Sequence, residues 1–261
     1  MDASVKGFKT TPEASPADIK FRSSEPSAIV GPASCGKSRL LASVADELPR
    51  GTPVLELDTE VKVGRVTPQG MLKHVSPDRI AELLTLTGLW DVRRKNVQSL
   101  GPGHQQAVTA LQFLSRPNHV VLLDGALDLL SPWVIDGVLS EMFKLQFPLV
   151  IATTNRPEIA EKFDRLLVLT ERGMRFDGRP HDFTRMVQPD EIEIESDDTS
   201  AIRALVEPFQ VQLDIDGRTM RFQARDGQEL AAKLIREGFP HIRLIAVKQP
   251  TLADALKLVL R

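Results

Sequence analysis

The sequence predicts an α/β protein with a mostly parallel sheet, followed by a small α+β domain. Two apolar runs, at 119–124 and 148–153, are typical of strands buried on both faces of a parallel sheet. A helical pattern at Pro132–Lys144 separates them, and strands that alternate with helices indicate this fold class. After Val187 the hydrophobic pattern changes to a period of two, which predicts the second domain.

Local patterns predict the other elements of the first domain. Residues 1–27 are rich in Ser, Pro, Lys and Thr, and they predict an irregular arm with an early strand near Ile19–Phe21. Ala28–Val30 predicts a short buried strand, and the apolar spacing after residue 38 predicts a helix. The remaining expected elements are strands at Val54–Leu57 and Arg165–Leu169, and helices at Pro77–Leu86, from Gly103 to before Pro117, and at Pro157–Phe163.

The C-terminal pattern predicts a module with the order β-α-β-β-α-β-α. An Asp216-Gly217 pair between two alternating runs indicates a β-hairpin. Helical stretches at 200–206, 228–237 and 252–260 complete the module, with one more strand before the last of them. The chain is therefore expected to hold two domains, 1–188 and 189–261.

Composition excludes several classes of protein. Lys and Arg number 33 against 35 Asp and Glu, so the net charge of −2 gives no general attraction to nucleic acid or to a membrane surface. A single cysteine, Cys35, rules out a disulfide within the chain and favours a reducing compartment. No signal peptide pattern and no apolar run near the ~20 residues of a bilayer span are present, so we expect no direct membrane insertion.

Residues 31–38, GPASCGKS, match the phosphate-binding pattern G-x-x-x-x-G-K-[ST] between a predicted strand and a predicted helix. Glycines allow backbone N–H groups to turn toward phosphates, and the N-terminus of the helix attracts anions. Lys37 would reach the β- and γ-phosphates, and Ser38 would bind Mg²⁺. The alternative is a glycine turn that carries a surface lysine.

Two neighbouring features bear on the same chemistry. Asp124 ends a buried strand, where P-loop proteins hold their second Mg²⁺ anchor; the alternative is an aspartate that caps the next turn. Cys35 lies at a helix N-terminus beside Lys37, which favours the thiolate. We interpret it as a small residue that fits the loop, with a redox-sensitive thiol as the alternative.

Taken in chain order, these residues resemble the nucleotide-binding subunit of ABC transporters. Gln69 stands at the place of the family's glutamine loop. LDGALDLLSP at 123–132 is similar to its Walker B and D-loop run, ATTN at 152–155 to its switch segment, and QPTLADAL at 249–256 to a tail of the exporter-like branch. The signature segment LSGGQ is matched by Leu100, Gly101, Pro102, Gly103 and His104.

The resemblance implies ATP and Mg²⁺ as ligands. Mg²⁺ would be held by Ser38, Gln69 and Asp124, and adenine would stack on Phe8, with Phe21 as an alternative ring. The nucleotide contacts would come from Gly31, Pro32, Ala33, Ser34, Cys35, Gly36, Lys37, Ser38 and Arg39. It also implies integral membrane permease subunits and a second ATPase subunit as partners, no nucleic acid, and a place at the cytoplasmic face of the membrane.

The chain departs from the family at the residues that hydrolyse ATP. The glutamate after the Walker B aspartate is Gly125, and a positioned general base is worth ~10²–10⁴ in rate. The switch histidine is Thr154, which has no cationic form. The signature serine is Gly101, and Pro102 removes a backbone N–H. The short interval before Leu100 predicts a reduced helical subdomain.

Three functions therefore remain open. The leading hypothesis is an ATP-binding subunit of an exporter-like complex that dimerises head to tail, with weak or no hydrolysis of its own. The first alternative is an active ATPase with a substitute base, for which Asp128 is the nearest carboxylate. The second is a soluble ABC-type protein or an ATP-dependent scaffold. No residue is assigned a catalytic role, and whether the chain is an enzyme stays open.

Overall fold

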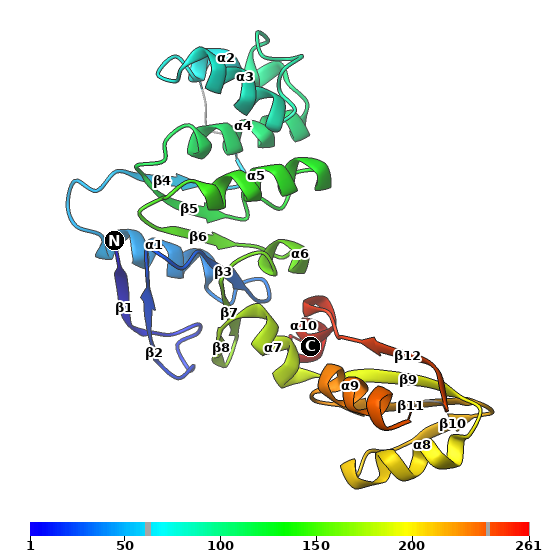
Figure 1. Cartoon of the computed structure of the whole chain (residues 1–261). Coiled ribbons are helices and arrows are strands. Elements are labelled where there is room, and N and C mark those ends of the chain that lie inside the picture. Colours follow the sequence, from blue (N-terminus) through cyan, green and yellow to red (C-terminus); the bar gives the residue numbers. More distant parts are fainter. Residues whose placement is uncertain (61–63, 239–240, 261) are drawn as a thin grey trace. The chain divides into compact units, whose positions relative to one another are not determined.

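The structure, a computed structural model, describes residues 1–60, 64–238 and 241–260. It divides the chain into two compact units, Met1–Pro180 and His181–Arg261 (Figure 1). The sequence pattern placed this boundary later, after residue 188. Helix α7 (Pro180–Val187) accounts for the difference, because Arg185 in this helix forms an ion pair with Asp226 of the second unit.

A six-stranded sheet with the order β4-β5-β6-β3-β7-β8 forms the centre of the first unit. The first five strands in this order run parallel, and β8 is antiparallel to β7, so the predicted mostly parallel sheet is confirmed. The strands are β3 (Ser27–Val30), β4 (Val54–Leu57), β5 (Val120–Asp124), β6 (Val150–Thr153), β7 (Arg165–Thr170) and β8 (Gly173–Gly178). Every residue of β3 and β6 is buried, as expected for central strands that are covered on both faces.

The helices of the first unit follow these strands in the chain. They are α1 (Lys37–Glu47), α2 (Pro68–Met71), α3 (Pro77–Leu86), the 3₁₀ turn η1 (Val97–Ser99), α4 (Pro102–Leu114), α5 (Pro132–Lys144) and α6 (Pro157–Ala160). Between β4 and α4, the described part of the helical insert consists of α2, α3 and η1 (Figure 1). The predicted helices at Pro77–Leu86 and Pro132–Lys144 are confirmed, whereas the one at 157–163 ends at Ala160. Backbone bonds from Lys162 to Ile159 and from Phe163 to Ala160 tighten its last turn.

The core on the α1 side explains how the phosphate loop is supported. Leu40 and Val44 of α1 are fully buried with Ile29 of β3 and Ile151 of β6 in one hydrophobic cluster. Burying a side chain of this size contributes about 1.5–3 kcal/mol. The loop between β3 and α1 is therefore held at both ends by packed elements.

The N-terminal segment is more regular than its composition predicts. Instead of an irregular arm with one strand, it forms an antiparallel hairpin of β1 (Ala3–Phe8) and β2 (Ala17–Phe21). Only one face of β1 is apolar, and Val5 and Phe8 on this face pack into the same cluster as α1. Because the other face of β1 carries polar residues, the composition of this segment resembles that of a loop and does not indicate a strand.

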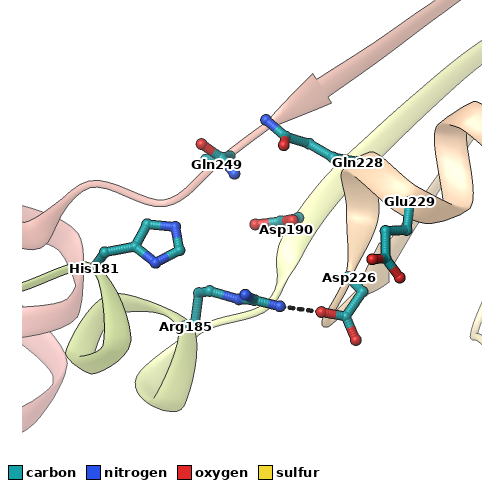
Figure 2. Close-up of a pocket in the computed structure, with 7 residues that line it drawn as sticks. All are labelled: His181, Arg185, Asp190, Asp226, Gln228, Glu229 and Gln249. Atoms are coloured by element: carbon teal, nitrogen blue, oxygen red, sulfur yellow. Dashed lines mark hydrogen bonds and ion pairs between the residues drawn. The ribbon is translucent and has the colours of Figure 1, made fainter. Parts of the chain in front are cut away.

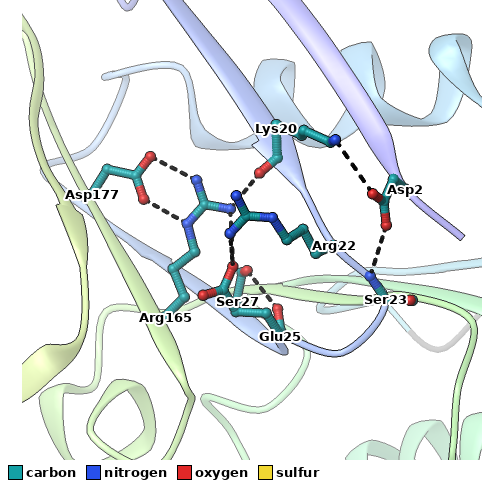
Figure 3. Close-up of polar contacts among 8 residues, drawn as sticks. All are labelled: Asp2, Lys20, Arg22, Ser23, Glu25, Ser27, Arg165 and Asp177. Atoms are coloured by element: carbon teal, nitrogen blue, oxygen red, sulfur yellow. Dashed lines mark hydrogen bonds and ion pairs between the residues drawn. The ribbon is translucent and has the colours of Figure 1, made fainter.

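A buried arginine ties this hairpin to the sheet (Figure 3). The Arg165 guanidinium donates from Nε and Nη2 to the two carboxylate oxygens of Asp177, at 2.5 and 2.6 Å. Its Nη1 donates to the Lys20 carbonyl oxygen at 2.6 Å, and its Cζ lies 5.4 Å from the centre of the Phe21 ring. Arg165 is 7% exposed, so this charge depends on these partners.

The second unit has its own sheet and its own core. The sheet has the order β10-β11-β9-β12 with antiparallel pairs throughout. Its strands are β9 (Asp190–Ser196), β10 (Asp214–Asp216), β11 (Thr219–Ala224) and β12 (Ile242–Lys248). Its helices after α7 are α8 (Thr199–Val206), η2 (Glu207–Phe209), α9 (Gly227–Gly238) and α10 (Leu252–Val259). Ile192 and Ile194 of β9 are buried together with Ile202 of α8 and Leu234 of α9.

The predicted hairpin in this unit is present, but its turn is shifted by one residue. Asp216 pairs with Thr219, so Gly217 and Arg218 form the two-residue loop rather than Asp216 and Gly217. Gly217 has a φ of +60° at the first loop position, where a type II′ turn needs a left-handed residue. Asp216 therefore ends the strand instead of occupying the turn.

Candidate functional site

The phosphate-loop sequence forms a strand–loop–helix unit in the structure. Gly31 follows β3 directly, and α1 begins at Lys37 with Gly36 as its N-cap. Ser34 and Gly36 have positive φ values of 65° and 90°. Left-handed residues of this kind turn backbone N–H groups into an anion-binding concavity, and the N-terminus of α1 adds its dipole.

Position 31 has no room for a side chain, so it requires glycine. A Cβ atom at this position would lie 2.4 Å from the Leu169 carbonyl oxygen and 2.7 Å from Cys35 Sγ. Both contacts are shorter than real Cβ contacts, so only glycine allows β7 to pass this close to the loop. The first glycine of the motif is thus fixed by packing as well as by loop shape.

The Lys37 side chain folds back over the phosphate loop, where it places its positive charge. Its Nζ donates to the carbonyl oxygens of Gly31 at 2.6 Å and of Pro32 at 2.8 Å. An ammonium group has three donors, so it bridges these two carbonyls with a donor to spare for an anion. Ser38, on the first turn of α1, has an exposed side chain.

Cys35 lies under the loop and not on its outer face. The side chain is fully buried, and burial raises the pKa of its thiol although the nearby Lys37 charge acts in the opposite direction. A raised pKa keeps the neutral thiol, which is the unreactive form. This supports the interpretation as a packing residue over that of a redox-sensitive thiol.

The carboxyl ends of the parallel strands bring the loop and Asp124 to one edge of the sheet. Ile29 of β3 and Asp124 of β5 both pair with Thr153 of β6, which lies between them. Two strand spacings separate the outer strands, which is roughly 10 Å. Ligands in open α/β sheets bind outside this edge, so the topology brings the predicted loop and the predicted magnesium residue to the edge where a ligand would bind.

Thr153 lies at this edge and orders Asp124, and sequence reasoning gave it no role beyond its place in the switch segment. Its hydroxyl donates to Asp124 Oδ1 at 2.6 Å and accepts from the Gly125 N–H at 2.9 Å. Only its position at the end of a predicted buried strand beside Thr154 could have indicated it. The contact orients the Asp124 carboxylate and leaves its second oxygen for a ligand. One carboxylate and one hydroxyl, from Ser38, fit Mg²⁺, which is bound by few protein oxygens together with phosphates and water.

Gly125, which the resemblance to ABC transporter subunits aligns with a catalytic glutamate, has a left-handed backbone. Its φ is +65°, and a Cβ atom would lie 3.3 Å from Thr59 Cγ2. A non-glycine residue costs about 1–2 kcal/mol in this conformation. The position therefore lacks the carboxylate and also has a backbone that disfavours one.

Thr154, at the switch position, is part of a network with Asp128. Its hydroxyl donates to Asp128 Oδ1, and its N–H donates to the Ile29 carbonyl oxygen at 3.1 Å. The Asn155 N–H donates to the other Asp128 oxygen at 3.0 Å, and Arg156 Nη1 donates to the Leu130 carbonyl oxygen at 2.9 Å. Both oxygens of Asp128 thus hold the backbone and side chains of the switch segment.

The other predicted site residues lie farther along the chain. Gln69 is in the short helix α2, where its side chain is exposed. Gly101 is the N-cap of α4, and the four residues Gly101, Pro102, Gly103 and His104 are exposed, whereas Leu100 is 7% exposed. Gln106, which ends the run that resembles the signature segment and was given no role of its own, is buried and donates to the Ala126 carbonyl oxygen beside Gly125.

Phe8 does not offer the stacking surface expected for adenine. It is 7% exposed, and its ring packs 3.4 Å from the Cβ position of Gly36. The Arg39 guanidinium covers the ring at 5.4 Å from its centre. The structure therefore argues against direct stacking on Phe8, because the hairpin buries this ring in the core. Phe21, the alternative ring, is fully buried.

A small cavity of about 190 Å³ lies in the second unit (Figure 2). Asp190, which is 5% exposed, accepts from the Gly227 N–H at 3.0 Å, and Arg185 pairs with Asp226. The rest of its lining comes from His181, Gln228, Glu229 and Gln249. Over residues 1–60, 64–238 and 241–260, no group of three or more His, Cys, Asp or Glu is placed to hold a metal ion.

The fold is similar to that of solved ABC transporter cassettes. The dimeric structure of MJ0796, described as a bacterial ABC transporter cassette, matches with a TM-score of 0.54 and 15% identity over 69% of this chain and 98% of that one. A post-hydrolysis state of the same cassette, bound to ADP and Pi, matches with a TM-score of 0.52 at the same identity and coverage.

Sequence comparison gives similar proteins with related names. The taurine import ATP-binding protein TauB of Jannaschia sp. (strain CCS1) is 27% identical over 66% of this chain and 74% of its own length. The Fe(3+) ions import ATP-binding protein FbpC 2 of Rhizobium meliloti (strain 1021) is 25% identical over 64% of this chain and 51% of its own. The Nod factor export ATP-binding protein I of Ralstonia nicotianae is 26% identical over 60% and 50%. The chain thus spans about half the length of the last two, and no family model matches it.

No helix in the described part of the chain combines the length and the apolar character needed to cross a membrane.

Proposed function

We propose that this chain is the ATP-binding subunit of an ABC-type membrane transport complex, and that it binds Mg-ATP while hydrolysing it slowly or not at all. ATP binding is supported by the loop geometry, in which Lys37 and the N-terminus of α1 converge beside Gly31. The relatives are ATP-binding proteins of transporters, which supports the transport context. Two of the three relatives described are named for import and one for export, so the proposal assigns no direction.

The observation that carries impaired hydrolysis is the left-handed backbone of Gly125. The position that would carry the general base has no side chain, and its φ of +65° disfavours any other residue. The switch position has Thr154, whose hydroxyl is already bonded to Asp128. Neither group is placed to take a proton from water, so the usual ~10²–10⁴ contribution of a general base is absent.

The alternative of an active ATPase would need Asp128 as substitute base. Its two carboxylate oxygens accept from Thr154 and from the Asn155 N–H, so they serve the switch segment. A base must be free to accept a proton in the reaction geometry. The contacts therefore favour a structural role for Asp128 and an ATP-binding role for the chain.

In the complex we propose, two cassettes meet head to tail at the cytoplasmic face of the membrane and act on permease subunits. The exposed N-terminus of α4, with Gly101 at its N-cap, would face the partner's phosphates. Pro102 at the first helical position offers no N–H there. The chain would thus give its partner a weak signature segment, and ATP would serve mainly to hold the two cassettes together. The second unit is proposed to support this pairing.

The experiment is a calorimetric titration of the chain with ATP and Mg²⁺, paired with a turnover assay. Lys37→Ala is expected to weaken ATP binding by about 10-fold or more, because a charge-assisted hydrogen bond to phosphate is lost. The matched control is Lys73→Ala, at an exposed lysine outside the loop. Turnover by the wild type is expected to equal that of Lys37→Ala.

Two results would contradict the proposal. Equal ATP affinity in the wild type and Lys37→Ala would mean that the loop binds no nucleotide and would favour a scaffold. Turnover well above the Lys37→Ala background would mean that a substitute base exists and that the chain is a working ATPase.

A further inference from the structure

An arginine is fixed on an aromatic ring beside the phosphate loop. Arg39 Cζ lies 5.4 Å from the centre of the Phe8 ring. Its Nη2 donates to the Lys9 carbonyl oxygen and, at 2.8 Å, to the Thr10 carbonyl oxygen. A Cβ atom on Gly36 would lie 3.1 Å from this Nη2, so the guanidinium borders the loop itself.

The two members of this pair differ in exposure. Phe8 is 7% exposed, whereas the Arg39 side chain is exposed to solvent. Both of the Arg39 bonds to backbone carbonyls come from Nη2, and in the part of the chain that the structure describes Nε and Nη1 of Arg39 make no hydrogen bond. The guanidinium therefore packs on the Phe8 ring on one side, is open to solvent on the other, and has N–H groups that are free to donate. Its orientation is set in advance, which lowers the entropy cost of binding against it.

A planar guanidinium is suited to a nucleobase. Arginine side chains stack on flat π-systems and bases stack on guanidinium planes, while unused N–H groups can hydrogen-bond to ring nitrogens or sugar oxygens. A lysine ammonium has no plane and cannot replace this contact. Since the guanidinium lies beside Gly36, we expect a nucleotide whose phosphates lie in the loop to place its sugar and base near Arg39.

We propose that Arg39 is the surface on which the base of the bound nucleoside triphosphate stacks, with Phe8 as its support from behind. This rests on the proposed function, because it needs triphosphate in the loop at 31–38. The arrangement gives the buried aromatic ring an indirect role, and it makes Arg39 the residue that distinguishes a nucleotide from a bare polyphosphate.

The test compares ATP with inorganic tripolyphosphate, both with Mg²⁺, by calorimetric titration of the full chain. Arg39→Lys keeps the charge but removes the plane. It is expected to weaken ATP binding by about 3- to 30-fold, the range of a cation–π contact, and to leave tripolyphosphate binding unchanged. Phe8→Leu, which removes the supporting ring, is expected to give a smaller loss in the same direction.

Controls separate this effect from misfolding. Arg50→Lys makes the same change at another exposed arginine of the first unit and is expected to alter neither affinity. Thermal melting of each variant shows whether it is folded, and Arg39→Lys carries the decision if Phe8→Leu fails to fold.

Three results would overturn the assignment. An equal loss of ATP and tripolyphosphate binding in Arg39→Lys would mean that Arg39 pairs with phosphate. Unchanged ATP binding would mean that the base lies elsewhere. Equal affinity of the wild type for both ligands would mean that the base adds nothing. If the wild type bound neither ligand, the proposed function itself would have failed, and the assignment with it.

Discussion

The hydroxyl of Thr154 donates a hydrogen bond to the carboxylate of Asp128. The two residues come from the turns that follow β6 and β5, so the bond joins two loops at the carboxyl edge of the sheet. A second bond, from the Asn155 N–H to the other carboxylate oxygen, makes the junction bidentate. Asp128 therefore holds the loop after β5 against the loop after β6.

Replacing Asp128 with Asn should lower stability without lowering any residual turnover. The substitution replaces one carboxylate oxygen by an NH₂ group, which cannot accept a hydrogen bond. The Asn155 N–H or the Thr154 hydroxyl therefore loses its acceptor, at a cost of about 1–3 kcal/mol in the free energy of unfolding. Urea unfolding measures this, with Asp91→Asn at an exposed position as the control. If turnover instead fell to the Lys37→Ala background while the fold held, Asp128 would be a base.

Restoring the missing carboxylate at Gly125 should not create an ATPase. Gly125→Glu forces a side chain onto a left-handed backbone and toward the Thr59 methyl group, so we expect a loss of about 1–2 kcal/mol in stability and no gain in turnover. A coupled phosphate-release assay checks the rate. Gly64→Glu, where a Cβ atom meets open space, controls for the added charge. A rate increase of 10-fold or more in Gly125→Glu would contradict this account.

The Cys35 thiol should be slow to react while the protein is folded. Burial raises the pKa of this thiol, so the thiolate stays scarce at pH values where an exposed cysteine already ionises. A group with a raised folded-state pKa contributes stability below its unfolded pKa and loses that contribution as the pH rises through the folded value. Stability should therefore fall in the alkaline range, and Cys35→Ser should reduce this fall.

Labelling with iodoacetamide in buffer and in denaturant measures the protection of Cys35. The chain has one cysteine, so a single adduct by mass reports this site alone. Equal labelling rates in the two conditions would show that the thiol is accessible in the folded protein.

Removing Arg165 should destabilise the first unit more than removing an exposed arginine. Arg165→Met leaves the Asp177 carboxylate and the Lys20 carbonyl oxygen without their donor, and the loss of one partner from a buried pair costs about 3–5 kcal/mol. Arg22→Met, which breaks a 3.6 Å pair between an exposed arginine and the partly buried Glu25, should cost less than about 1 kcal/mol. Thermal and urea unfolding compare the two, and equal losses would show that the Arg165 network adds little.

Much of the first unit could be predicted because its strands are continuous apolar runs. The strand at Val54–Leu57 and the helices at Pro77–Leu86 and Pro132–Lys144 have the predicted bounds. The hairpin of β1 and β2 could not be predicted, because its stability comes from Val5 and Phe8 packing on α1, which is a tertiary contact. For the same reason Phe8 was expected to be available to a ligand when it is in fact part of the core.

At the site, the loop could be predicted from spacing, but the way its parts are held could not. The sequence predicts that Gly125 and Thr154 differ from the ABC pattern that the chain resembles, yet it cannot show that one has a left-handed φ or that the other is bonded to Asp128. Those facts depend on how β5 and β6 end beside each other. The roles of Thr153 and Gln106 could not be predicted, because each acts on a neighbouring loop through a contact between residues distant in sequence.

The turn at Gly125 also limits how this position could be redesigned. Its φ of +65° lies in the region that favours glycine, and a Cβ atom there would lie 3.3 Å from Thr59 Cγ2. A single substitution at this position therefore gives a strained backbone. A stable carboxylate here requires a turn of a different shape as well as a different residue.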